Sequence, residues 1–145
     1  IGFVIYSKEE SRPTVYDNSP LQQKRILVGS TTYMVSVADT EARREQGLSG
    51  TKPLEPYTGM LFIFEKSGKY GFWMKNMYYP LDIVWANVNS DGVGTIVYIE
   101  QNIQPDTYPK MFTNVNVANI VIELTAGEIS KNNIKIGDRV YIGKK

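Results

Sequence analysis

The segment of residues 72–85 concentrates the residue types in this chain that could do chemistry. Trp73, Lys75, Asn76 and Asp82 stand there among apolar residues, in a stretch that is otherwise typical of the core of a β-sheet. Charged side chains are costly to bury unless they are paired. Lys75 and Asp82 therefore lie either at the rim of the core or at a functional site.

The spacing of Lys75 and Asp82, with Pro80 between them, allows two interpretations. A tight connection at the proline would let neighbouring strands bring the two side chains together as an ion pair or hydrogen-bonded clamp. In the functional interpretation, Asp82 is a general base or a ligand acceptor and Lys75 holds an anionic group.

Aromatic residues accompany this pair. Trp73 and Lys75 would share one face of a strand, because side chains alternate, and Asn76 would lie on the other face. Exposed aromatic rings can stack on sugars, which makes Trp73 a candidate ligand contact, whereas we expect Trp85 in the core. Further aromatic residues expected in the core or at its rim are Tyr70, Tyr78, Tyr79 and Tyr98.

Arg44 and Glu123 form a second candidate pair. Residues 41–46 are good helix formers between a capping Asp39 or Thr40 and a terminating Gly47, and Arg44 lies within this predicted helix. Glu123 lies inside an apolar run that predicts a buried strand, where a carboxylate needs a partner. We therefore predict a structural Arg44–Glu123 pair.

The composition excludes several kinds of chemistry. Without cysteine or histidine, the chain cannot use thiol catalysis, disulfides, a Ser-His-Asp triad or the usual zinc sites. Any metal would be a hard cation on oxygen ligands, but calcium-loop and Walker motifs are absent from the sequence, so we expect no metal and no cofactor. Sixteen basic and fifteen acidic residues give a net charge of +1, which does not favour nucleic-acid binding.

The order of polar and apolar segments predicts one mostly β domain. Residues 7–23 are polar, so we expect a flexible N-terminal arm over 1–23 and a compact β-sandwich or barrel-like domain over 24–145, with one or two short helices. Residues 102–116 predict a long irregular loop, and Asn133 suits a left-handed cap after a helical turn at 127–133. The predicted strands cover residues 25–28, 31–37, 60–64, 71–77, 81–87, 95–101, 118–124 and 139–142.

Several blocks of this sequence together resemble the prokaryotic domain-of-unknown-function family 192. An opening block covers 38–48 and 59–64, a central block contains 72–76 and 80–83, and a closing block covers 121–127 and 134–140. Their order and spacing are compatible with the family from about residue 33 to 142. Three positions depart from the family pattern: Arg43 stands where Glu is usual, Ser49 where Met is usual, and Thr51 where Arg is frequent. Any function that depends on those residues is in doubt here.

The resemblance implies a mostly β, sandwich-like domain and frequent export, but no established activity. The sequence has no run near the roughly 18 apolar residues of a membrane span. Residues 1–6 are apolar and could follow a removed signal or anchor. We therefore expect an extracytoplasmic protein, secreted or anchored through a segment absent from this sequence, while a cytoplasmic location stays open.

The sequence supports three hypotheses about function. The first is a small monomeric module that binds a small polar or sugar-like ligand, or an envelope partner, around Trp73, Lys75 and Asp82. The second is a hydrolase or isomerase with Asp82 as general base and Lys75 as electrostatic stabiliser. The third is a purely structural accessory domain that binds another envelope protein through the loop over 102–116. The candidate ligand contacts, taken together, are Trp73, Lys75, Asn76, Asp82, Arg44 and Glu123.

Overall fold

The computed structural model describes residues 3–4 and 18–144 of the chain. The predicted arm, residues 1–23, therefore lies largely outside the described residues. Within the described ranges, no helix is long and apolar enough to cross a membrane.

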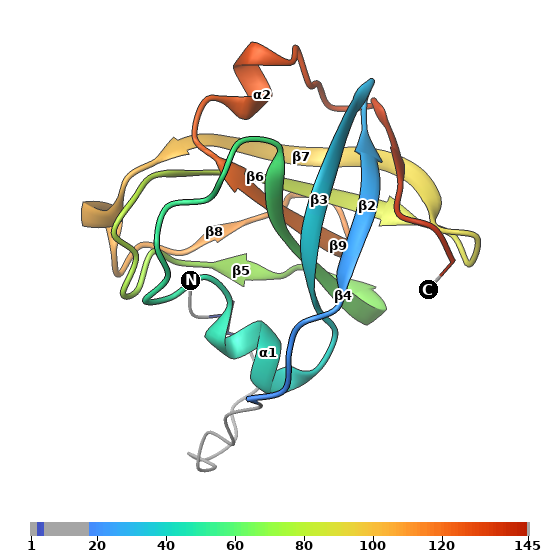
Figure 1. Cartoon of the computed structure of the whole chain (residues 1–145). Coiled ribbons are helices and arrows are strands. Elements are labelled where there is room, and N and C mark those ends of the chain that lie inside the picture. Colours follow the sequence, from blue (N-terminus) through green and yellow to red (C-terminus); the bar gives the residue numbers. More distant parts are fainter. Residues whose placement is uncertain (1–2, 5–17, 145) are drawn as a thin grey trace.

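Seven strands form a closed barrel in the order β10-β2-β3-β4-β9-β6-β7 (Figure 1). Neighbouring strands are antiparallel except β3 and β4, which are parallel and are connected through helix α1. The mostly β prediction is thus confirmed, in its barrel form. The barrel strands are β2 (Gln23–Val28), β3 (Thr31–Ala38), β4 (Thr58–Gly68), β6 (Leu81–Val88), β7 (Val93–Ile103), β9 (Ala118–Thr125) and β10 (Arg139–Tyr141).

Two short helices lie at opposite ends of the molecule in Figure 1. Helix α1 (Glu41–Gln46) begins after Thr40, whose side chain accepts a hydrogen bond from the Arg43 amide, and ends at Gly47. Helix α2 (Glu128–Lys131) is followed by Asn133, which has the predicted positive φ, at 52°. Both helices agree with the sequence prediction.

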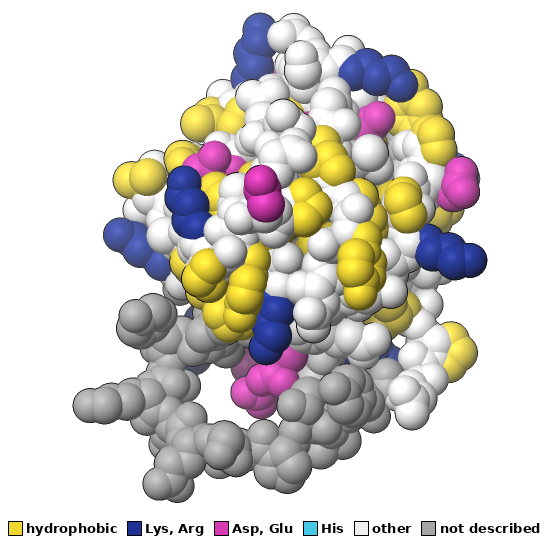
Figure 2. All heavy atoms as spheres, turned by 90° about the vertical axis from the view of Figure 1, so that its left-hand side faces the viewer, with side chains coloured by type: hydrophobic (Ala, Val, Ile, Leu, Met, Phe, Trp, Pro, Cys, Tyr) yellow, Lys and Arg dark blue, Asp and Glu magenta, His cyan; other side chains and the backbone are white. Residues whose placement is uncertain are grey.

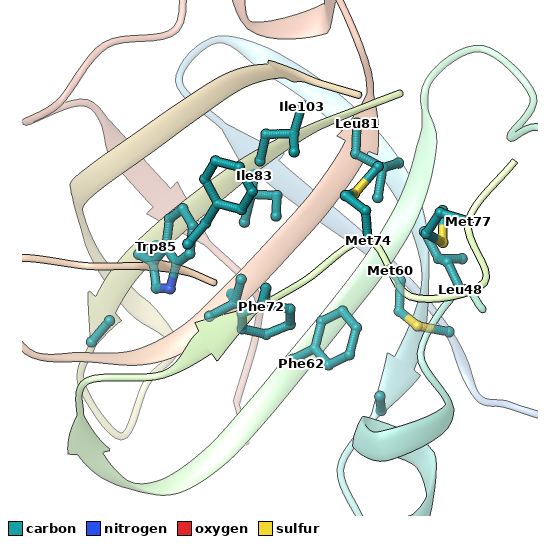
Figure 3. Close-up of a cluster of buried hydrophobic side chains, with 14 of the residues drawn as sticks. Leu48, Met60, Phe62, Phe72, Met74, Met77, Leu81, Ile83, Trp85 and Ile103 are labelled. Atoms are coloured by element: carbon teal, nitrogen blue, oxygen red, sulfur yellow. The ribbon is translucent and has the colours of Figure 1, made fainter. Parts of the chain in front are cut away.

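Side chains of alternating strand residues divide between two hydrophobic clusters. One cluster fills the barrel interior and includes Val35, Leu61, Val84 and Ile122. The other lies outside β4, β9 and β6, and a second layer of chain covers it (Figure 3). This layer contains a small sheet of β1 (Phe3–Val4), β5 (Gly71–Phe72) and β8 (Phe112–Thr113), and residues 73–80, which we call the strap.

Two sequence predictions about this outer layer are wrong. The predicted strand over 71–77 stops at Phe72, because the chain turns at Asn76, whose φ is 56°, and the Met77 amide donates to the Met74 carbonyl. The predicted loop over 102–116 is shorter than expected. Strand β7 runs to Ile103, a 3-10 helix, η1, covers Pro105–Thr107, and β8 follows.

Candidate functional site

The strap has a buried face and an exposed face. Met74, Met77 and Tyr79 are buried against the barrel, whereas Lys75 and Tyr78 are exposed. Loop residues 49–51 hold the strap through three hydrogen bonds. Ser49 Oγ donates to the Lys75 carbonyl at 2.9 Å, the Gly50 amide to the Asn76 carbonyl at 2.9 Å, and Thr51 Oγ1 lies 2.8 Å from the Tyr79 hydroxyl.

The exposed side of the strap carries an aromatic and cationic surface. The Trp73 ring meets the Tyr108 ring edge to face at 5.2 Å, and the Lys75 ammonium lies 5.5 Å from the centre of the Trp73 ring. Tyr78 is 74% exposed and Tyr108 is 42% exposed. Figure 2 views this side of the molecule and shows hydrophobic side chains gathered over its middle, with basic side chains beside them. We call Trp73, Lys75, Tyr78 and Tyr108 the aromatic surface.

Both carboxylate oxygens of Asp82 accept hydrogen bonds from the backbone. Its side chain is 0% exposed. One carboxylate oxygen accepts from the Asn102 amide at 2.8 Å, and the other accepts from the Gly127 amide at 3.0 Å and the Ile129 amide at 2.9 Å. The carboxylate thus joins the end of β7 to the start of α2, and three N–H donors surround it.

Lys75 and Asp82 do not form the predicted pair. On β6, Leu81, Ile83 and Trp85 point outward into the cluster under the strap, so strand alternation directs Asp82 to the opposite face. Lys75 lies on the exposed side of the strap, and no ion pair between the two occurs among the described side chains. Asn76 occupies the exposed turn of the strap rather than a strand face.

The predicted pair of Arg44 and Glu123 is also wrong. Arg44 Nη1 donates to the Asp39 and Ile63 carbonyls, each at 2.9 Å, and its guanidinium lies over the Phe64 ring. Burial lowers the pKa of Arg44. Glu123 pairs in register with Met60, three residues from Ile63 along β4, which is roughly 10 Å at the rise of a strand. Helix α1 therefore places the Arg44 guanidinium beside Ile63, too far along β4 to reach Glu123.

Glu123 is a buried carboxyl group without a hydrogen-bond partner among the described residues. It is 0% exposed, and both of its oxygens lack a hydrogen-bond partner within the described part of the chain. Burial raises the pKa of Glu123 to about 8. The pKa of Tyr79 is raised by burial and, to a smaller degree, by the charge of Glu123, which places the Tyr79–Thr51 hydroxyl pair near the carboxyl group.

Sequence reasoning missed two parts of this arrangement. Tyr108 lies in the predicted loop, and only the return of that loop over the strap brings its ring to Trp73. The sequence marked Thr51 as a departure from a family pattern, but nothing in it indicated a contact with Tyr79. In the described ranges, no cluster of three or more acidic residues could hold a metal ion.

Comparison with known proteins places the chain in a family. Residues 24–142 match the DUF192 family model, described as "Uncharacterized ACR". The chain belongs to the DUF192 family. None of the curated proteins is significantly similar to this DUF192 protein.

Two solved structures resemble this DUF192 protein over most of their length. A Sinorhizobium meliloti protein, described as a candidate transcription regulator, is 30% identical, with a TM-score of 0.75 over 86% of this chain and 96% of its own. A Novosphingobium aromaticivorans protein of unknown function is 26% identical, with a TM-score of 0.76 over 90% of this chain and 92% of its own. Both similarities support the barrel fold, and neither description assigns a ligand.

The three departures from the family pattern all make contacts in this DUF192 protein. Arg43 Nη1 forms an ion pair with Asp39 at 3.1 Å. Ser49 and Thr51 both act on the strap, through the Lys75 carbonyl and the Tyr79 hydroxyl. Ser49 therefore contacts the strap at an exposed residue, Lys75, and Thr51 contacts it at a buried residue, Tyr79.

Proposed function

We propose that this protein is a small binding module and that the aromatic surface recognises its ligand, a small polar molecule with an apolar face, such as a sugar. The observation that carries the proposal is the grouping of Trp73, Lys75 and Tyr108, with ring and ammonium contacts of 5.2 and 5.5 Å. Exposed aromatic rings bury the C–H faces of sugars, and an ammonium group donates hydrogen bonds to their hydroxyls.

Two further features support a recognition role for this surface. Tyr78 is the most exposed of the large hydrophobic side chains in the described residues, and it stands on the same strap. The Trp73 indole N–H is shielded from solvent and has no hydrogen-bond partner in the described structure. An unsatisfied donor of this kind gains a partner if a ligand hydroxyl reaches it.

The geometry does not favour the enzyme hypothesis based on Asp82. A general base needs a free lone pair within reach of the substrate proton, and the Asp82 carboxylate is enclosed and accepts three backbone amides. We therefore centre the proposed binding site on Trp73 and Lys75 and leave Asp82 out of it. The transcription-regulator description of the Sinorhizobium protein gains no support from the net charge of +1, because DNA binding favours a basic surface.

The test is a titration with a panel of mono- and oligosaccharides, monitored by amide chemical-shift changes. Binding should shift amides of the strap and of residues 104–111, and the double variant Lys75→Ala/Tyr78→Ala should weaken it at least about tenfold, since contact side chains of this kind are each worth about 1 kcal/mol. Tyr141→Ala is the matched control, because Tyr141 is 50% exposed on β10, outside this surface. Shifts that persist unchanged in the double variant would refute the proposed surface. If every sugar fails, an envelope protein becomes the occupant to test.

We also propose that the protein works outside the cytoplasm as a monomer. The absence of cysteine suits an oxidising compartment, because no thiol can be lost to oxidation. The resemblance to frequently exported family members supports the same location. Fractionation of cells that express the full-length gene product, together with its mass in solution by light scattering, tests both statements.

A further inference from the structure

The environment of Glu123 identifies a second place where the protein can bind something. Glu123 lies on β9 between Met60 of β4 and Ile83 of β6, and it shares their outward face because paired residues in register point the same way. The carboxyl group is completely buried, and neither oxygen has a partner in the part of the chain that the structure describes. Buried polar groups are nearly always hydrogen-bonded, so such an exception needs an explanation.

Among the described side chains packed on this face, none brings an opposite charge to the carboxyl group; burial raises the pKa of Glu123 more than the positive charge of the N-terminus lowers it. Arg44 of α1 is held by the Asp39 and Ile63 carbonyls, and Asp82 of β6 points to the other face of the barrel. Lys75 of the strap lies over the half-buried Trp73 ring. The titratable neighbour is Tyr79 of the strap, whose hydroxyl is bonded to Thr51.

The cover over this face is apolar and adaptable. Met60, Met74 and Met77 belong to the same cluster as Ile83 and Tyr79, and Figure 3 shows the three methionines with Leu48 in the layer between strap and barrel. Methionine side chains are unbranched and repack around irregular shapes. Hydrogen bonds from Ser49 and Gly50 hold the turn of the strap over this face, so a guest that enters beneath the strap has to displace this segment.

We propose that Glu123 anchors an internal binding site for a small organic cation, an ammonium group on a short alkyl body, that enters beneath the strap. The ammonium would donate hydrogen bonds to both carboxylate oxygens, which have no other donor among the described groups. The thioethers and Ile83 would pack the alkyl part, and the Tyr79–Thr51 hydroxyls would border the charged end. This site is separate from the aromatic surface, which lies on the other side of the strap.

Protonation gives this site a distinctive signature. Because burial raises the pKa of Glu123 to about 8, the carboxyl group is mainly neutral at pH 7. A cation binds the carboxylate form, so binding releases the Glu123 proton to solvent. Affinity should therefore rise about tenfold for each pH unit up to about pH 8 and then level off.

The experiment is calorimetric titration with n-butylammonium chloride at about pH 6, 7, 8 and 9, with n-butanol and sodium chloride as probes that lack the cation or the alkyl chain. We expect n-butylammonium to bind the wild type with an affinity that rises about tenfold per pH unit up to about pH 8. We expect little binding of n-butanol or sodium chloride. Glu123→Gln should not bind n-butylammonium. Glu100→Gln should bind like the wild type, because Glu100 already accepts the Tyr98 hydroxyl at 2.7 Å on β7. Equal affinity in Glu123→Gln and wild type, or no binding to the wild type at any of these pH values, would overturn the proposal.

A second measurement needs no variant and covers the case in which Glu123→Gln does not fold. Titrations of the wild type in two buffers with different heats of ionisation count the protons released on binding. The proposal requires about one proton per bound cation near pH 6 and close to none above about pH 9. A count that does not change between these conditions contradicts it.

Discussion

Asp82 and Glu123 lie on paired strands, one residue apart in register, and their carboxyl groups point to opposite faces of the barrel. Asp82 receives three backbone amides at the end closed by α2, whereas Glu123 receives no hydrogen bond from any described residue. The two groups are equally buried, at 0% exposure. At equal burial, Asp82 is hydrogen-bonded and Glu123 is not, so we expect the two carboxyl groups to contribute differently to stability.

The stability of the protein should fall with rising pH because of Glu123. Its pKa is raised from 4.5 in the unfolded chain to about 8 in the folded protein, so the folded state holds a proton that the unfolded state releases. The stabilisation from this bound proton is fully present below about pH 4.5. Between about pH 4.5 and 8 it declines by about 1.4 kcal/mol per pH unit, and above about pH 8 it is lost. Urea unfolding at a series of pH values measures it. Glu123→Gln should remove this slope, and parallel curves for the two proteins would contradict the assignment.

Replacement of Asp82 by alanine should destabilise the fold strongly. The change leaves three amides without an acceptor, which should lower the free energy of unfolding by about 3 kcal/mol. Asp82→Asn should cost less, because its amide oxygen can still accept. Urea denaturation compares both with Asp91→Ala, an exposed residue of the β6–β7 turn that should change little. A loss below about 0.5 kcal/mol in Asp82→Ala would show that these bonds do not support the fold.

An arginine at position 51 should bring a side-chain cation to Glu123, whose oxygens have no hydrogen-bond partner among the described residues. The Thr51 hydroxyl lies 2.8 Å from the Tyr79 hydroxyl. Burial and, to a smaller degree, the charge of Glu123 raise the pKa of Tyr79, so position 51 lies near the Glu123 carboxyl group. A guanidinium reaching the carboxylate would lower the pKa of Glu123 and flatten the pH dependence of stability. Thr51→Val, which removes the hydroxyl without adding charge, should keep the wild-type slope. Carboxyl titration by NMR would reveal an unchanged pKa if the arginine remains in solvent.

Arg44 should matter for the docking of α1 and not for the titration of Glu123. Arg44→Ala removes two hydrogen bonds to carbonyls and the contact with Phe64, so we expect a loss of about 2 kcal/mol. The slope of stability against pH between about 5 and 8 should stay that of the wild type. A changed slope would indicate that Arg44 does act on Glu123, as the sequence had suggested.

Local patterns in the sequence were sufficient for much of the fold. Alternation and apolar runs located the strands over 31–37, 81–87 and 118–124, because burial on one or both faces of a sheet follows directly from residue order. The capping residue and terminating glycine placed α1. The blocks around 72–83 and 121–140 identified the family. All these features depend on neighbours within a few residues.

The candidate site depended on contacts that only the closed barrel creates. The strap covers the outer face of β6, where Ile83 points outward and Asp82 points inward. Lys75 on the strap is therefore separated from Asp82 by the strand. The position of α1 along β4 separated Arg44 from Glu123, and the path of residues 104–111 brought Tyr108 to Trp73. The sequence by itself thus determined the barrel strands, the first helix, the family and the presence of a carboxylate in an apolar run. Only the tertiary structure decided which charges meet, because register and strand packing join residues that are far apart in the chain.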